Sequence, residues 1–252
     1  MNFIKDVFRA ILHYPKAVQL IIKLRLYPYL FIPLIISIVL MISFGLIVYF
    51  SHTPLAQFLG NHIPEFLQEY ITVKVVDVMI SVFLIGFFFL IFKHLVMGLS
   101  APFMSKVSEL IEEHFTQLPV KSPKFSPALK RGLRINLRNT LLELTWVIGL
   151  ALLSWIPVVG IAFVILSFLI QAYYTGFGNI DYTLERYLNY KVSIRFVQRN
   201  KGLAVGNGII FMLFAFIPIL GIIFILPVSA VAATITTLER LKAEKFAPTL
   251  VN

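Results

Sequence analysis

Two long apolar runs, each divided by the same proline–glycine motif, constrain the fold of this chain more than any other feature. Residues 139–180 carry one charged side chain, Glu143, and residues 202–238 carry none. Within the runs, "SWIPVVGIAFVI" and "AFIPILGIIFIL" align at one offset of 61 residues, which takes Ile156 to Ile217. Each run is too long for a single membrane span, and proline and glycine interrupt helices. We therefore expect a helical hairpin in each run.

Composition supports a membrane protein before any other motif is considered. The 252 residues are 59% hydrophobic and 13% charged, with a mean hydropathy of +0.88. A soluble domain is about half apolar and a quarter charged. Residues 29–50 offer an uncharged stretch of about 33 Å at 1.5 Å per residue, which is enough to cross the hydrocarbon core. Residues 71–96 form a second predicted span.

Two further segments have the pattern of amphipathic helices. In residues 1–25 and 100–118, apolar side chains recur at helical spacing with charged residues between them. This pattern predicts helices that lie in the membrane interface. We expect Pro15 to end the first helix, with a short second one following it. The chain is thus predicted to be a single all-α membrane domain of two spans, two hairpins and interfacial helices.

The basic residues of the chain are distributed unevenly. The net charge is +10, and with such apolar runs we expect anionic lipid rather than nucleic acid as its partner. Of the 22 Lys and Arg residues, 21 lie in the segments 1–25, 93–138, 181–201 and 239–252. The positive-inside rule then predicts a multi-pass inner-membrane protein with both termini in the cytoplasm.

The sequence leaves two alternatives for how deeply the hairpins enter the membrane. Residues 202–217 number 16, or about 24 Å of helix, against a hydrocarbon core of about 30 Å. The two turns, "WIPVVGI" and "FIPILGI", contain no Asn, Asp, Ser or Lys, which suggests burial and a re-entrant hairpin. The other alternative is that each turn simply closes a compact hairpin at the far surface.

If the turns are buried, they offer a site for an anion. Pro157 and Pro218 are suited to the first turn of a returning helix. The free N–H groups there, near Gly160 and Gly221, would carry the positive end of the helix dipole. Two such ends facing one cavity favour an anion, as broken helices do in transporters.

Five motifs in order resemble the CysZ sulfate permease family, within the wider etoposide-induced-protein family of membrane proteins. They are "FIPLI" at 31–35, "SAPFMSKVSE" at 100–109, "IPVVG" at 156–160, "DYTLE" at 181–185 and "IPILGIIFILPVSAVAAT" at 217–234. The resemblance covers roughly residues 20–240. It implies two long transmembrane helices, two pairs of half-penetrating helices, and sulfate uptake by an oligomer.

The chain departs from this family just before the first span. The family carries a glycine, a hydrophobic residue and one or two arginines there, implicated in sulfate binding. The aligned positions here read Arg25–Leu26–Tyr27–Pro28, so the arginine pair is absent. The resemblance leaves Arg25 as the candidate entry or binding charge.

Other polar residues are interpreted as structural. We expect Glu143 to form an interfacial ion pair with a basic neighbour, and Asp181 and Glu185 to pair with Arg186, Arg195 or Arg199. Gly202, Gly206 and Gly208 are expected to allow close helix packing. No nucleophile–base pair, metal cluster or phosphate loop is found in the sequence, so we expect no enzyme, catalytic residue, metal or cofactor.

The predicted function is therefore an inner-membrane sulfate or oxyanion permease, or a channel-like transporter, of the CysZ type. Its partners would be the oxyanion, membrane lipids and further copies of the chain. The alternative is a membrane-organising or interaction protein that binds anionic lipid and transports nothing.

Overall fold

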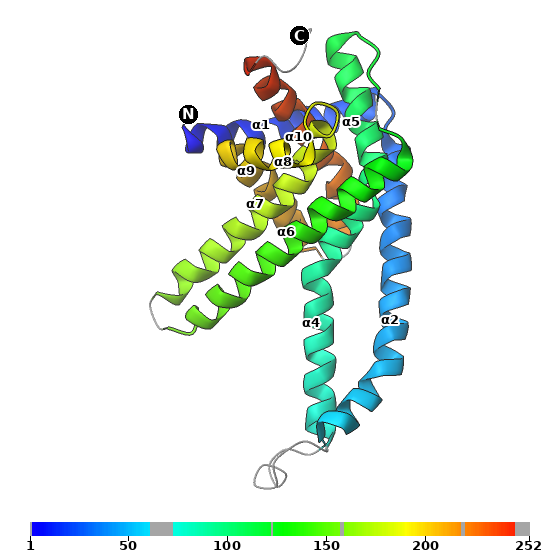
Figure 1. The fold of residues 1–252 in the computed structure, drawn as a ribbon, viewed down its shortest axis with the longest axis vertical. Helices are drawn as coiled ribbons and strands as arrows, with labels where there is room; N and C mark the ends of the chain where they lie inside the picture. Colours follow the sequence, from blue (N-terminus) through cyan, green and yellow to red (C-terminus); the bar gives the residue numbers. More distant parts are fainter. Residues whose placement is uncertain (1, 61–72, 122, 157–158, 218–219, 245–252) are drawn as a thin grey trace. The chain divides into compact units, whose positions relative to one another are not determined.

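The computed structural model describes residues 2–60, 73–121, 123–156, 159–217 and 220–244, and these residues form helices and no strand. This confirms the predicted all-α class (Figure 1). The elements in chain order are α1 (Phe3–Lys23), η1 (Tyr27–Leu30), α2 (Phe31–Gly60), α4 (Val73–Leu99), α5 (Ala101–Thr116), α6 (Phe125–Leu153), α7 (Gly160–Leu184), α8 (Tyr190–Arg199), α9 (Lys201–Ala215) and α10 (Leu220–Ala243).

Several of these helices are suited to a membrane. Among the described residues, three segments are long and apolar enough to cross it: Tyr27–Leu55, Gly160–Leu184 and Ile223–Ala243. A fourth results if the segments Val78–Phe88 and Ile91–Leu99 of α4 count as one broken span. The predicted membrane character is thereby confirmed. The short apolar helix α9 has 15 residues, about 22 Å, less than the hydrocarbon core.

The chain divides into two compact units. One consists of residues 37–93, where α2 and α4 contact each other through the stacked rings of Phe44 and Phe88, whose centroids lie 3.9 Å apart. Its small buried cluster is formed by Val76 and Ile80, with Leu84 against them. The other unit consists of residues 1–36 and 94–252 and contains every candidate site described below.

In the larger unit, α7 is the central helix and packs against α6, α9 and α10. Its approach to α9 is close because the helices meet at glycines. A methyl group on Gly176 would overlap the Ala204 carbonyl oxygen, and one on Gly208 would overlap that of Ala172. Gly202 and Gly206 similarly face α1. This confirms the prediction that these α9 glycines serve helix packing rather than a nucleotide loop.

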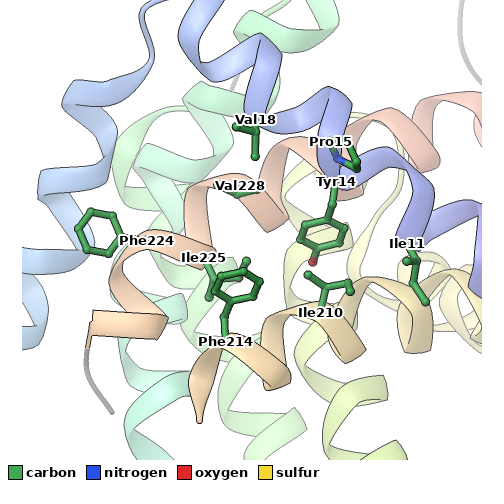
Figure 2. A pocket seen from close by; sticks show the side chains of 9 residues that line it. All are labelled: Ile11, Tyr14, Pro15, Val18, Ile210, Phe214, Phe224, Ile225 and Val228. Carbon is green, nitrogen blue, oxygen red and sulfur yellow. The ribbon is translucent and has the colours of Figure 1, made fainter. Parts of the chain in front are cut away.

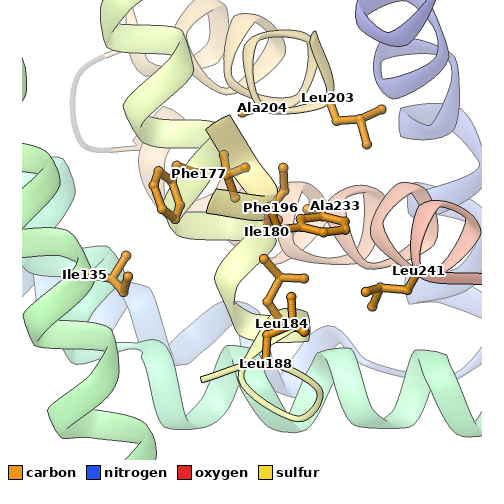
Figure 3. Close-up of a cluster of buried hydrophobic side chains, with 11 residues drawn as sticks. Ile135, Phe177, Ile180, Leu184, Leu188, Phe196, Leu203, Ala204, Ala233 and Leu241 are labelled. Atoms are coloured by element: carbon orange, nitrogen blue, oxygen red, sulfur yellow. The ribbon is translucent and has the colours of Figure 1, made fainter. Parts of the chain in front are cut away.

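A cluster of buried apolar side chains holds this unit together (Figure 3). Phe177, Ile180 and Leu184 of α7 lie at its centre. The remaining members come from α6, α8, α9, α10 and the segment after α7, and they are Ile135, Leu188, Phe196, Val197, Leu203, Ala204, Ala233 and Leu241. The carboxyl end of α7 is therefore fixed among α6, α8, α9 and α10.

The N-terminal helix corrects one expectation. Pro15 does not end it, because α1 continues unbroken to Lys23. The proline ring is exposed, and the face formed by Ala10, Tyr14 and Ala17 packs against α9 and α10 and holds the helix across the missing hydrogen bond. Large apolar side chains of α1 point outward instead, and they include Phe3, Ile4, Phe8, Leu12 and Ile22.

Helix boundaries differ from the predicted ones where polar residues are helical. Helix α6 begins at Phe125, well before the apolar run that starts at residue 139, and it packs against α5. Helix α2 extends past the predicted end of the first span to Gly60, with Pro54 inside it. The positions of charged residues and prolines therefore indicate where the apolar segments end, but they do not indicate where the helices end.

Candidate functional site

The two repeated turns have the same backbone hydrogen bonds. The N–H of Gly160 donates to the carbonyl of Ile156, and that of Gly221 donates to Ile217, both at 2.9 Å. One turn earlier, Ile156 donates to Leu153 at 3.1 Å and Ile217 donates to Phe214 at 2.9 Å. The 61-residue repeat in sequence is therefore a repeat in structure. Pro157 and Pro218 lie outside the described residues.

Glycine is needed in both turns because the chain passes close to the helix that enters. A methyl group at Gly160 would overlap the carbonyl oxygen of Ser154, and one at Gly221 would overlap that of Phe214. The returning helix α7 begins at Gly160, after Val159 as N-cap. The prediction that Pro157 and Pro218 open the returning helices concerns residues outside the described ones and stays a prediction. The N–H groups of both glycines are already bonded within the turns.

Arg25 lies at the junction between α1 and the first span. Its φ of 53° places it in the left-handed region, directly after the residue that caps α1. Its side chain is exposed, and it forms no hydrogen bond or ion pair with any described residue. Arg25 is thus a free cation at the start of a membrane span, and no described contact joins its side chain to either turn.

A buried charged cluster that sequence reasoning missed lies between α5 and the segment after α7. The Arg186 guanidinium donates to Oε2 of Glu112 from Nε at 2.9 Å and from Nη2 at 2.8 Å. It also donates to Ser108 Oγ at 2.8 Å, and the Tyr187 hydroxyl donates to Glu112. The helical spacing of α5 placed Glu112 on a polar face, but that face packs inward against α7 and α10.

Hydroxyl groups continue this cluster into the bundle. Ser108 of α5, Thr183 of α7 and Thr234 of α10 lie within hydrogen-bond distance of one another, at 2.8 to 3.2 Å. All three side chains are fully buried. A guanidinium beside three hydroxyls is a set of donors suited to a tetrahedral oxyanion. Each of the three hydroxyl residues lies in a motif that carries the family resemblance, at 100–109, 181–185 and 217–234, but their wide separation in the sequence gave no sign that they meet.

The expected partners of the two acidic residues near the end of α7 are wrong. Asp181 pairs with Arg131 of α6, whose Nε and Nη2 donate to its two oxygens at 2.9 and 2.8 Å. Glu185 accepts from the Ser105 hydroxyl. Burial is the main cause that raises the pKa of Glu185 to about 7, and nearby Asp181 raises it further while Ser105 and two arginines oppose the shift.

Glu143 is also paired differently from the expectation. It is buried, and its Oε2 lies 2.8 Å from Nε2 of His94 on α4. Its basic neighbour Arg138 donates to Asn139 instead. The Arg138 side chain lies over the ring of Phe177, and its guanidinium carbon is 5.5 Å from the ring centroid.

Hollows open between the helices of this unit. One, of about 480 Å³, is an apolar groove between α1, α9 and α10, and no charged residue lines it (Figure 2). Tyr14 lines this groove, and its hydroxyl donates to the Asn207 carbonyl at 2.6 Å. Another, of about 800 Å³, lies between α6, α7 and the start of α9, and Lys201 is the one charged residue in its lining.

Comparison with known proteins gives two matches. The family model described as "Sulfate transporter CysZ/Etoposide-induced protein 2.4" matches residues 14–225. A relative from Vibrio parahaemolyticus serotype O3:K6 (strain RIMD 2210633), named "Sulfate transporter CysZ", is 28% identical over 238 residues. That alignment covers 90% of this chain and 93% of the relative.

Proposed function

The chain belongs to the Sulfate transporter CysZ/Etoposide-induced protein 2.4 family, and on this premise we propose that it is a permease for sulfate or a related oxyanion. The observation that supports this most is the buried cluster of Arg186 with Ser108, Thr183 and Thr234. It supplies a guanidinium and several hydroxyl groups in the interior of a helical bundle, and some helices of this bundle are long and apolar enough to cross a membrane. Such donors replace the water that an oxyanion loses on leaving solution.

Passage would require Arg186 to exchange partners. In the present arrangement its donors are occupied by Glu112 and Ser108. An arriving oxyanion competes with the Glu112 carboxylate for the same guanidinium, because both ligands are anions that accept hydrogen bonds from its N–H groups. The ion pair then acts as a closed gate that the substrate opens, and it closes again once the anion has left.

The sites expected from the sequence have supporting roles in this proposal. Arg25 is a free exposed cation and serves to attract the anion at the membrane edge. Gly160 and Gly221 lie in two compact turns, and the contribution of Pro157 and Pro218 to anion passage stays a prediction. Because the glycine N–H groups are bonded within the turns, their contribution is to shape the backbone rather than to bind the anion.

The non-transporting alternative is not favoured by the family or by the name of the relative. Location in the inner membrane, with both termini in the cytoplasm, belongs to the proposal and is supported by the distribution of Lys and Arg. Assembly with further copies of the chain is also part of the proposal, as the family resemblance implies. The substrate could be sulfate or another tetrahedral oxyanion, since the donors recognise that shape.

The test is uptake of radiolabelled sulfate into vesicles that contain purified variants. Ser108→Ala removes one donor and should raise the half-saturating sulfate concentration about fivefold, the effect of one hydrogen bond of ~1 kcal/mol. The control is Ser126→Ala, because Ser126 is exposed on α6 and its side chain has no described partner. Arg25→Ala should slow uptake at low salt, whereas Lys5→Ala, at the other end of α1, should not. Equal kinetics for Ser108→Ala and Ser126→Ala would contradict the proposed pathway.

A further inference from the structure

The 800 Å³ cavity between α6, α7 and α9 combines an apolar wall with a single cation. Its wall is formed by Trp146 and Leu150 of α6, Leu166 and Ile170 of α7, and Val205 of α9. These α7 residues belong to a segment that is long and apolar enough to span the membrane. The volume lies within the range of about 300–1,000 Å³ that is usual for small-molecule sites.

The other end of the cavity is polar and positively charged. Gln198 of α8 and Lys201, the first residue of α9, line it together with Tyr173 and Tyr174 of α7. Lys201 is exposed and forms no ion pair with any described residue, and no acidic side chain lines the cavity. The positive charge is therefore uncompensated within the cavity. Tyrosine and tryptophan are the residues that usually mark the level of lipid headgroups.

We propose that this cavity is a binding site for one anionic phospholipid. The acyl chain lies along Leu150, Leu166 and Ile170, and the phosphate pairs with the Lys201 ammonium while Gln198 donates a hydrogen bond to it. Along the cavity, apolar side chains are followed by the cationic Lys201. In a phospholipid, the acyl chain is likewise followed by the phosphate, so the two sequences of groups match. This inference does not depend on the transport of sulfate.

The apolar groove of Figure 2 offers a comparison inside the same unit. It lies between α1, α9 and α10 and is lined by side chains such as Ile11, Val18, Ile210 and Val228. Because none of the described residues that line it is charged, it gives no preference for an anionic lipid. It therefore serves as the control site rather than as a second proposal.

The test is native mass spectrometry of the full chain in detergent with palmitoyl-oleoyl phosphatidylglycerol or the matched phosphatidylcholine. We expect one phosphatidylglycerol to be retained more strongly than phosphatidylcholine. Lys201→Gln should weaken that binding about fivefold, since one lysine contributes ~1 kcal/mol near an anionic headgroup. The control Lys191→Gln removes an exposed lysine of α8 that does not line the cavity, and it should leave binding unchanged.

A second pair of variants tests the apolar wall. Leu169→Trp fills the cavity and should lower the binding of phosphatidylglycerol, while Val18→Trp fills the groove of Figure 2 and should not. Circular dichroism checks that each variant is folded. Equal retention of both lipids, or equal effects of Lys201→Gln and Lys191→Gln, would overturn the proposal. So would displacement of the lipid by inorganic sulfate beyond that by sodium chloride of equal ionic strength, because Lys201 would then be a site for the free anion.

Discussion

Arg186 and Glu112 form an ion pair that is almost wholly buried, with side chains 4% and 2% exposed. Removal of one partner leaves an uncompensated charge in the bundle, so Glu112→Ala should destabilise the protein by about 3–5 kcal/mol. The double variant Glu112→Leu/Arg186→Met replaces both charges by apolar groups and should recover most of this loss. Thermal unfolding in detergent measures both effects. A double variant less stable than Glu112→Ala would contradict the account.

The same double variant separates stability from transport. If Arg186 binds the oxyanion, the double variant should fold and yet show no saturable uptake. Uptake at the level of the unmodified protein would show that the ion pair has only a structural role.

Glu185 predicts a dependence of stability on pH. Its pKa is raised from 4.5 to about 7, chiefly by burial, so between these values the folded protein holds a proton that the unfolded chain releases. Stability attributable to this group therefore falls as pH rises from about 4.5 to 7 and levels off above that. Glu185→Gln should remove this component of the pH profile. The exposed Glu244→Gln is the control, and an unchanged profile in Glu185→Gln would contradict the assignment.

The repeated turns predict a contrast between glycines. Gly160→Ala and Gly221→Ala should each cost about 1–3 kcal/mol, because the added methyl group overlaps a carbonyl oxygen of the entering helix. Gly149→Ala, on α6, meets nothing within 4 Å and should be neutral or slightly stabilising. Midpoints of thermal unfolding distinguish the two classes. Similar midpoints for Gly149→Ala and Gly160→Ala would argue against the compact turn.

The docking of α1 depends on one buried hydroxyl. Tyr14 donates to the Asn207 carbonyl at 2.6 Å and lies 2.8 Å from Ser229 Oγ, so it links α1 to both arms of the second hairpin. Tyr14→Phe should cost about 1–3 kcal/mol because it leaves buried acceptors unpaired. Tyr27→Phe, at an exposed position of η1, should have no effect. Protease cleavage near the N-terminus would report detachment of α1, and equal cleavage of the two variants would exclude it.

Long apolar runs were enough to predict the helical class and the presence of several helices that are apolar enough to cross a membrane. These features depend on local composition, which decides whether a segment can be buried in lipid. The partners of charged residues were not predictable, since Arg131 and Asp181 are 50 residues apart and meet only through the packing of α6 on α7. The polar face of α5 was visible in the sequence, but whether it faces water or protein depends on α7 and α10.

Uptake of radiolabelled sulfate into proteoliposomes that hold the purified, unmodified protein tests the central claim most directly. The account predicts saturable uptake that excess unlabelled oxyanion suppresses and that Ser108→Ala shifts to higher concentration. Uptake equal to that of empty vesicles, from protein shown to be folded by circular dichroism, would contradict it.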